Sequence, residues 1–185
     1  MTSADVDDLA TAEWTRAGEE TSTYGTFTLN TDGTWTYDLN GADVDSLTQG
    51  ETVTETYAVQ VSDGLGGIAT ETVTITINGT NDAPTVTSGA DDAAGAVTEA
   101  GIAADGSEVA GTARAEGTLT SADVDEDATA TWTRTGAESS TYGTFNLNAD
   151  GTWTYDLDGA DVDSLDQGDT VTETYAVQVL SLIHI

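Results

Sequence analysis

The sequence contains no cysteine and no lysine, only one proline and no long apolar run. Without cysteine the fold has neither disulfides nor thiolate metal sites, so another means of stabilisation is expected. No stretch approaches the roughly 20 apolar residues that span a bilayer, and the first residues lack the basic and apolar regions of a signal peptide. We therefore expect no membrane insertion, and we expect any export signal to lie outside this sequence.

Positive charge is also scarce. Asp and Glu number 34 against three Arg, which gives a formal net charge of -31 over 185 residues. Such a surface repels phosphates and anionic headgroups, so binding to nucleic acid is disfavoured, and cations are the expected partners. No enzyme is predicted, because nucleophile and base pairs need Cys, Lys or a well-placed His, and the single His184 is near the end. A glycosidase needs only two carboxylates, but no insertion that could form a cleft is apparent.

The strongest positive feature is an internal repeat. Residues 2–61 match residues 120–179 at an offset of 118, with 49 of 60 positions identical. This period is too long for a solenoid unit and has the size of a small domain, so the sequence predicts a tandem array of independent domains.

The alignment of the two copies indicates that neither is whole. We expect a first repeat over residues 1–80 without its first strands, a linker over 81–85, and a second repeat over 86–179 without its closing hairpin strand. Residues 180–185 read Leu-Ser-Leu-Ile-His-Ile where the first copy has Ser-Asp-Gly-Leu-Gly-Gly. We interpret them as a non-native tail and leave them outside the expected fold.

Alternating apolar residues predict two hairpins in the first copy. Residues 27–29 and 35–39 flank Asn30-Thr31-Asp32-Gly33, whose Asp-Gly pair suits a tight turn. Residues 52–62 and 69–78 flank a glycine-rich turn and are rich in β-branched side chains. Between the hairpins, residues 42–47 could form one helical turn.

Further strands are predicted in the second copy at residues 108–120 and 130–134, with short ones at 85–88 and around Val97. Short strands separated by turns at this spacing are typical of an antiparallel β-sandwich of immunoglobulin or cadherin type. The expected fold class is therefore all-β, a tandem antiparallel β-sandwich. The Trp and Tyr residues are then expected in the core and not on a sugar-stacking surface.

Oxygen ligands are expected to gather at the linker. Asn81 and Asp82 precede Pro84, which ends a strand. The predicted strand at 108–120 returns the chain to the same end, so Asp123 and Asp125 should lie beside them. Carboxylates this close repel unless a hard cation neutralises them, and Ca²⁺ accepts six to eight oxygen ligands.

The first copy repeats the acidic pair as Asp5 and Asp7. A simpler interpretation is also open: Asp and Asn favour turns, and a very acidic surface can be merely solvated or adapted to salt.

Several motifs in the same order resemble the VCBS repeat, a cadherin-like domain found in tandem in large bacterial adhesins of the RTX type. The motifs are Ala96-Val97-Thr98-Glu99, Ala122-Asp123-Val124-Asp125, Asp150-Gly151-Thr152-Trp153-Thr154-Tyr155 and Gly79-Thr80-Asn81-Asp82-Ala83-Pro84. The resemblance implies an extracellular stalk stiffened by calcium, often exported by a type I system. It also implies that Glu99 contributes to the junction after the second copy, while Asn81, Asp82, Asp123 and Asp125 serve the junction within this chain.

The expected function is thus a structural or adhesive segment of a bacterial surface protein, used in attachment or biofilm formation. Its expected partners are calcium, neighbouring repeats and a host-surface or biofilm-matrix ligand. The alternatives are a module that itself binds a carbohydrate or protein and, more remotely, an accessory domain of a secreted hydrolase. Near-identity of the copies favours a spacer, because repetition adds length without requiring a unique site.

Overall fold

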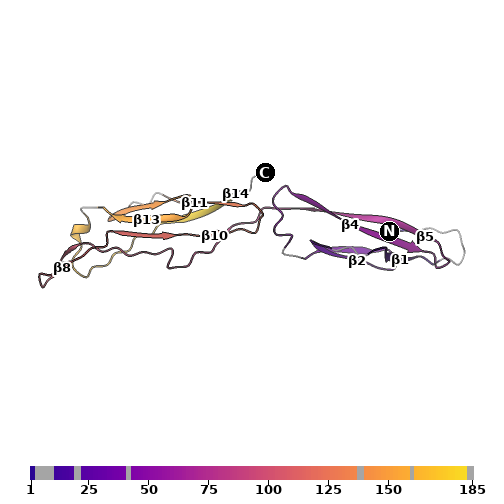
Figure 1. The fold of residues 1–185 in the computed structure, drawn as a ribbon, viewed down its shortest axis with the longest axis horizontal. Helices are drawn as coiled ribbons and strands as arrows, with labels where there is room; N and C mark the ends of the chain where they lie inside the picture. The colour runs from indigo at the N-terminus through magenta and orange to yellow at the C-terminus, as the bar shows by residue number, and fades with distance from the viewer. Residues whose placement is uncertain (3–10, 19–21, 41–42, 137–139, 159–160, 183–185) are drawn as a thin grey trace. The chain divides into compact units, whose positions relative to one another are not determined.

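The computed structural model describes residues 1–2, 11–18, 22–40, 43–136, 140–158 and 161–182. The chain divides into two compact units, unit 1 over Met1–Asp82 and unit 2 from Ala83 onward. Both units consist of antiparallel strands, and no α-helix occurs in the ranges given above (Figure 1). The predicted all-β fold of the cadherin-like sandwich class is confirmed.

Unit 1 contains five strands among its described residues. A sheet of order β1-β4-β5 faces a two-stranded sheet of β2 and β3. The strands are β1 (Glu13–Arg16), β2 (Gly25–Leu29), β3 (Trp35–Leu39), β4 (Thr52–Ser62) and β5 (Ile68–Asn78).

Both predicted hairpins are confirmed in unit 1. In the β2–β3 hairpin Phe27 pairs with Tyr37, and Gly33 supplies the positive φ, at 85°, that its turn requires. The β4–β5 hairpin pairs eleven residues on each side, from Thr52 opposite Asn78 to Ser62 opposite Ile68. Residues 43–46 form a turn and not the helical turn that was expected.

The core of unit 1 lies between its two sheets. The ring of Phe27 stacks on that of Tyr57 with centroids 4.4 Å apart, and Tyr57 and Val59 are almost completely buried. The residues of this core are Trp14, Phe27, Tyr57, Val59 and Val73. Because Tyr57 and Val59 come from β4 and Phe27 from β2, the core fastens the two sheets to each other.

Unit 2 is built from more and shorter strands. Its sheets pair β10 with β6, β11 with β14 and β7 with β8, and a three-stranded sheet has the order β12-β13-β9. The strands are β6 (Thr85–Val86), β7 (Gly101–Ile102), β8 (Glu108–Val109), β9 (Arg114–Thr118), β10 (Ser121–Ala122), β11 (Thr129–Arg134), β12 (Gly143–Leu147), β13 (Thr152–Leu157) and β14 (Val177–Leu182), with one 3₁₀ turn, η1 (Val162–Ser164).

The core of unit 2 contains Leu119, Trp132 and Trp153. The indole of Trp153 donates a hydrogen bond to the carbonyl of Asp92 at 2.8 Å, and β9 lies alongside it. Gly117 of β9 pairs with Trp153, where a Cβ would come within 2.6 Å of the indole nitrogen. The backbone can approach the ring this closely only because this residue is glycine.

The expectation of one strand over residues 108–120 is wrong. The segment is divided into β8, which pairs with β7, and β9, which pairs with β13. The chain changes partner at Gly111, where a Cβ would lie 2.6 Å from the amide nitrogen of Ala100. Hydrophobic alternation indicates only which face of a strand is buried. It therefore cannot predict where a strand changes its pairing partner.

The two units repeat the register of the strand pair that carries the first tryptophan. Trp14 faces Val61 in β1–β4, and Trp132 faces Val179 in β11–β14. Residues 180–182, which were left outside the expected fold, continue β14 and pair with Thr129–Thr131. Alternating leucines and available β11 backbone groups are sufficient to extend the strand there.

Candidate functional site: two acidic positions and a half-buried glutamate

The predicted residues Asp123 and Asp125 lie together in unit 2. Ala122 at the end of β10 pairs with Thr85 at the start of β6, so Asp123 follows directly on the ladder. The backbone N–H of Asp125 donates to Asp123 Oδ1 at 3.1 Å. Asp125 is only 5% exposed, and the buried Oδ2 of Asp123 accepts no hydrogen bond from a described residue. A buried carboxylate oxygen without a donor is energetically unfavourable unless another positive group satisfies it.

The same loop contains Asp127 with φ of 59°. Left-handed backbone is costly for most side chains but is tolerated by Asp. Asp127 lies in the turn between β10 and β11.

The other predicted ligands of this cluster are not brought together by what the structure describes. Asn81 and Asp82 belong to unit 1, where the Asn81 amide donates to the carbonyl of Asp82. Their expected meeting with the acidic loop therefore stays a prediction. Asp5 and Asp7 lie outside the described residues. Within the described parts of both units, no group of three or more His, Cys, Asp or Glu could hold a metal ion.

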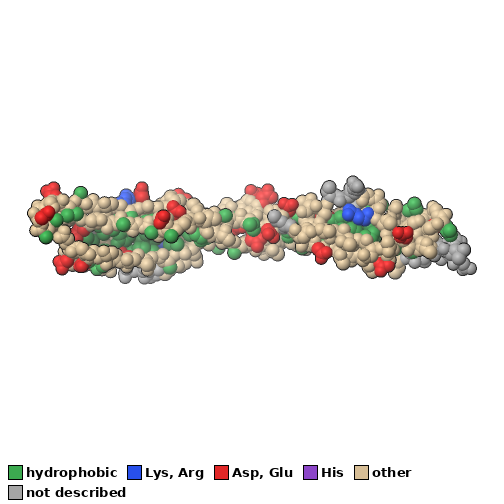
Figure 2. Space-filling model, turned by 90° about the horizontal axis from the view of Figure 1, so that it is seen from below, with side chains coloured by type: hydrophobic (Ala, Val, Ile, Leu, Met, Phe, Trp, Pro, Cys, Tyr) green, Lys and Arg blue, Asp and Glu red, His purple; other side chains and the backbone are tan. Residues whose placement is uncertain are grey.

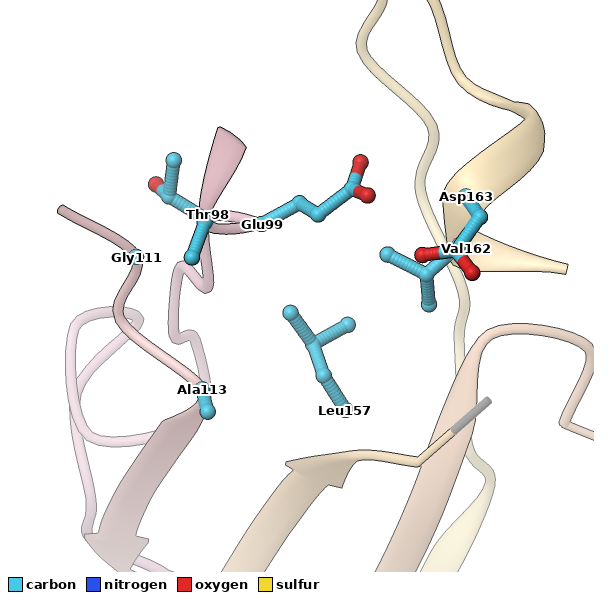
Figure 3. A pocket seen from close by; sticks show the side chains of 8 residues that line it. Thr98, Glu99, Gly111, Ala113, Leu157, Val162 and Asp163 are labelled. Carbon is cyan, nitrogen blue, oxygen red and sulfur yellow. The ribbon is translucent and has the colours of Figure 1, made fainter. Parts of the chain in front are cut away.

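Glu99 occupies a different place in unit 2. It lines a hollow of about 340 Å³ together with Leu157 and Val162, and its carboxylate points across toward that of Asp163 (Figure 3). Burial raises the pKa of Glu99, and so do a hydrogen bond that its protonated carboxyl group donates to Asp163 and the nearby negative charge of Asp163. Two carboxyl groups in such an arrangement share a proton at low pH and repel each other once both are ionised.

A feature that sequence reasoning missed is a half-buried glutamate in each unit, Glu55 in unit 1 and Glu173 in unit 2. Glu55 Oε2 accepts hydrogen bonds from the hydroxyls of Tyr57 at 2.6 Å and Tyr37 at 2.7 Å. Its Oε1 accepts from the backbone N–H groups of Thr23 at 2.7 Å and Tyr24 at 3.1 Å. The carboxylate thereby fixes the segment before β2 onto β4.

Unit 2 repeats this arrangement around Glu173. Its Oε2 accepts from the hydroxyls of Tyr155 at 2.6 Å and Tyr175 at 3.0 Å, and its Oε1 accepts from the N–H of Thr141 at 2.6 Å. The alternation of the strand contains the signal: positions 53, 55, 57, 59 and 61 read Val, Glu, Tyr, Val, Val, so an acidic residue stands on the inward face.

The hydrogen bonds determine the protonation of this glutamate. Burial alone would raise the pKa of Glu55, but the bonds from Tyr57, Tyr37 and the two backbone N–H groups lower it to about 2. The pKa of Glu173 is lowered to about 2 by the corresponding donors. Conversely, burial and the bond to Glu173 raise the pKa of Tyr155 to about 12. The glutamates are therefore ionised and the tyrosines neutral at physiological pH, as a structural anchor requires.

The basic residues stabilise the sheets elsewhere. Arg16 lies over the ring of Tyr57 at 5.5 Å, and Arg134 lies over Tyr175 at 5.2 Å. Arg114 pairs with Asp156 at 3.4 Å. On the face in Figure 2, acidic side chains are spread over both units and basic ones are few. Such a surface attracts divalent cations.

Comparison with known proteins agrees with the fold. Residues 1–79 match the model of a family described as the bacterial cadherin-like domain. No curated protein matches the chain. Among the residues that the structure describes, no helix is long and apolar enough to cross a membrane. Residues 1–79 are thus similar to a class of domain that serves as a structural or adhesive module.

Proposed function

We propose that the chain is a segment of a secreted bacterial surface protein, and that its repeats, of the VCBS type, form a stalk stiffened by calcium for adhesion or biofilm formation. The cadherin-like match and the all-β fold support the structural role. The near-identical second copy supports repetition, because a spacer gains length from each unit. An extracellular or surface location accords with the domain class.

The observation that carries the calcium part is the loop after β10. Asp125 is only 5% exposed, and the buried Oδ2 of its neighbour Asp123 accepts no hydrogen bond from a described residue. Carboxylate oxygens are the ligands of a hard cation, and Ca²⁺ binds six to eight of them or of equivalent oxygens. We propose that Asp123 and Asp125 supply two of the ligands, while Asn81 and Asp82 stay ligands predicted from the sequence. Glu99 would serve a separate junction.

Calcium bound to such a site would neutralise the acidic loop and stabilise the folded state. With an affinity of about 0.1 to 1 mM, 10 mM calcium should add about 1.4 to 2.7 kcal/mol to the free energy of unfolding. We expect the melting temperature to rise in calcium and to fall in chelator, as scanning calorimetry would measure.

The matched variants separate binding from general charge effects. Asp123→Asn with Asp125→Asn removes the proposed ligands, whereas Glu108→Gln with Glu116→Gln removes the same charge at exposed positions. Calcium should stabilise the second variant as it does the parent chain, and it should leave the first unchanged. If calcium stabilises both variants equally, the assigned ligands are wrong; if the parent chain itself does not respond, the calcium function is wrong.

A second candidate function, a module that binds a carbohydrate or protein, is favoured by one observation. Trp35 was expected in the core but is 40% exposed, which corrects that prediction. Exposed aromatic rings can stack on sugars or anchor a protein partner. However, the corresponding Trp153 is 6% exposed beneath β9, so the exposure of Trp35 reflects a missing neighbour strand among the described residues more than a dedicated site.

A further inference from the structure

Unit 1 brings two tyrosines from different sheets to one oxygen atom. Tyr37 lies on β3 of the two-stranded sheet, and Tyr57 lies on β4 of the three-stranded sheet. Their hydroxyls donate to the same Glu55 Oε2, at 2.7 and 2.6 Å. A single carboxylate oxygen therefore bridges the two phenol oxygens, although the two side chains come from opposite sides of the core.

The two rings are also close to each other, and unit 2 repeats the arrangement. The centroids of Tyr37 and Tyr57 are 6.2 Å apart, with an angle of 52° between the ring planes. Tyr155 and Tyr175 share Glu173 Oε2, and their centroids are 6.3 Å apart at 45°. Rings joined by a carbon–carbon bond lie closer than this, so the pair must approach by a small movement of the kind that local fluctuations supply.

The shared glutamate prepares the phenols for the loss of a hydrogen atom. An oxidised phenol is a far stronger acid than a carboxyl group, so a carboxylate bonded to the hydroxyl accepts the proton as the electron leaves. Although burial raises the pKa of Glu55, its hydrogen bonds lower it to about 2, so this acceptor is ionised.

The surroundings of the two rings determine which is oxidised first. Arg16 lies over the ring of Tyr57 at 5.5 Å, and its positive charge disfavours the loss of an electron there. Tyr57 is also only 1% exposed, whereas Tyr37 is half-buried and can be reached by a small oxidant. The first radical therefore forms on Tyr37, next to the ring with which it can combine.

We propose that Tyr37 and Tyr57 are a modification site, at which a diffusible one-electron oxidant, such as a radical derived from hydrogen peroxide, joins the two rings as dityrosine. Each phenol gives one electron to one oxidant molecule and one proton to Glu55, which releases it to water. The two phenoxyl radicals form a carbon–carbon bond between the ring positions next to the hydroxyls. The hydrogens on these two carbons then move to the oxygens and restore the phenols, so the chain loses two hydrogens in all.

The cross-link joins the two sheets of unit 1 covalently. It closes a loop of about twenty residues, and a cross-link of this length stabilises a fold chiefly by restricting the unfolded chain. The sequence has no cysteine, so disulfides cannot supply such a link. A bond between Tyr155 and Tyr175 does the same in unit 2. This modification needs no calcium and is independent of the proposed stalk.

The test treats the dilute chain with a photo-activated ruthenium complex and persulfate, and it measures dityrosine fluorescence and the masses of proteolytic peptides. We expect peptides that join residues 37 and 57, or residues 155 and 175, each lighter by two hydrogens than the two separate peptides. In chelator, the melting temperature of the oxidised monomer should rise by at least about 5 °C.

Matched variants separate this site from general tyrosine oxidation. Tyr37→Phe with Tyr155→Phe removes one phenol from each pair, and the phenylalanine rings keep the packing. Tyr24→Phe with Tyr142→Phe removes two other half-buried tyrosines. The intramolecular cross-link should be lost in the first variant and kept in the second.

Three results would overturn the proposal. The first is an equal yield of intramolecular dityrosine in both variants, and the second is dityrosine formed only between chains. The third is oxidation of the tyrosines without any peptide that joins the two members of a pair.

Discussion

The two units contain nearly the same sequence, but different neighbouring strands cover it in each unit. The stretch Thr-Trp-Thr-Tyr-Asp-Leu occurs at 34–39 and at 152–157. In unit 2 β9 covers it and buries Trp153, while in unit 1 Trp35 is 40% exposed. The relation reverses for residues 52–61 and 170–179, where β5 covers only the first copy.

This comparison shows which features of a strand depend on its own sequence and which depend on the neighbouring strands. The β2–β3 and β12–β13 hairpins keep one register in both units, with Phe27 opposite Tyr37 and Phe145 opposite Tyr155. The long strand β4, by contrast, is shortened to β14 where its second neighbour is absent from the described residues. Hairpins with tight turns are local, whereas the extent of an edge strand depends on its partner.

The sharpest test of the comparison is to remove the same tryptophan from each unit. Trp153→Ala should cost unit 2 about 3 to 5 kcal/mol, since it empties a packed core and loses the bond to Asp92. Trp35→Ala should cost unit 1 only about 1 to 2 kcal/mol, because the ring is already partly in water. Hydrogen exchange of the two hairpins measures each loss separately. Equal losses would mean that β9 does not determine the burial of this ring.

A smaller effect, equal in both units, is expected at the half-buried glutamates Glu55 and Glu173. Glu55→Gln and Glu173→Gln should each cost about 1.5 to 3 kcal/mol, because charged hydrogen bonds to tyrosine hydroxyls and backbone N–H groups are weakened. Denaturant unfolding monitored by exchange gives each value. Glu71→Gln, at an exposed position of β5, is the control and should change stability by less than about 0.5 kcal/mol.

The lowered pKa of these glutamates also predicts how the stability of the fold changes at acidic pH. Their folded pKa is about 2, below the ordinary value of 4.5. A lowered folded pKa contributes stability that is present above the ordinary value and is lost as the pH falls toward 2. The double Gln variant should therefore lose less stability than the parent chain between pH 4.5 and 2. A melting temperature that falls equally in both proteins would contradict this assignment.

The smallest expected effect concerns Glu99, which lies in unit 2. The pKa of Glu99 is raised, so this group favours folding below its ordinary pKa and ceases to do so as the pH rises through the folded value. In chelator at pH 7, Glu99→Gln should relieve repulsion from Asp163 and raise the melting temperature of unit 2 by no more than about 2 °C. At pH 4 the gain should vanish. A decrease in melting temperature at pH 7 would show that the ionised Glu99 is stabilising.

The two hairpins of unit 1 and the fold class could be predicted from the sequence because alternation and Asp-Gly turns are local signals. The strand predicted around Val97 was wrong, since Thr98 makes only an isolated bridge to Thr112. The division between β8 and β9 could not be predicted, since it depends on which strand lies alongside residues 110–113. Of the candidate site, Asp123 and Asp125 lie together, with a hydrogen bond from the Asp125 N–H to Asp123 Oδ1, but their role as ligands stays a prediction. The network around Glu55 depends on residues 22–24 approaching β4, a contact between segments about thirty positions apart that no periodicity reports.

The matching registers of β1–β4 and β11–β14 also bear on how the chain refolds. Residues 170–179 have the same sequence as residues 52–61. During folding they can therefore pair with β1 equally well. Joining β1 to the wrong one closes a loop about four times longer, which costs only about 1.2 kcal/mol of chain entropy. Strand exchange between repeats is therefore avoided only if each repeat folds before the next is available. This happens when a chain emerges in order from its N-terminus.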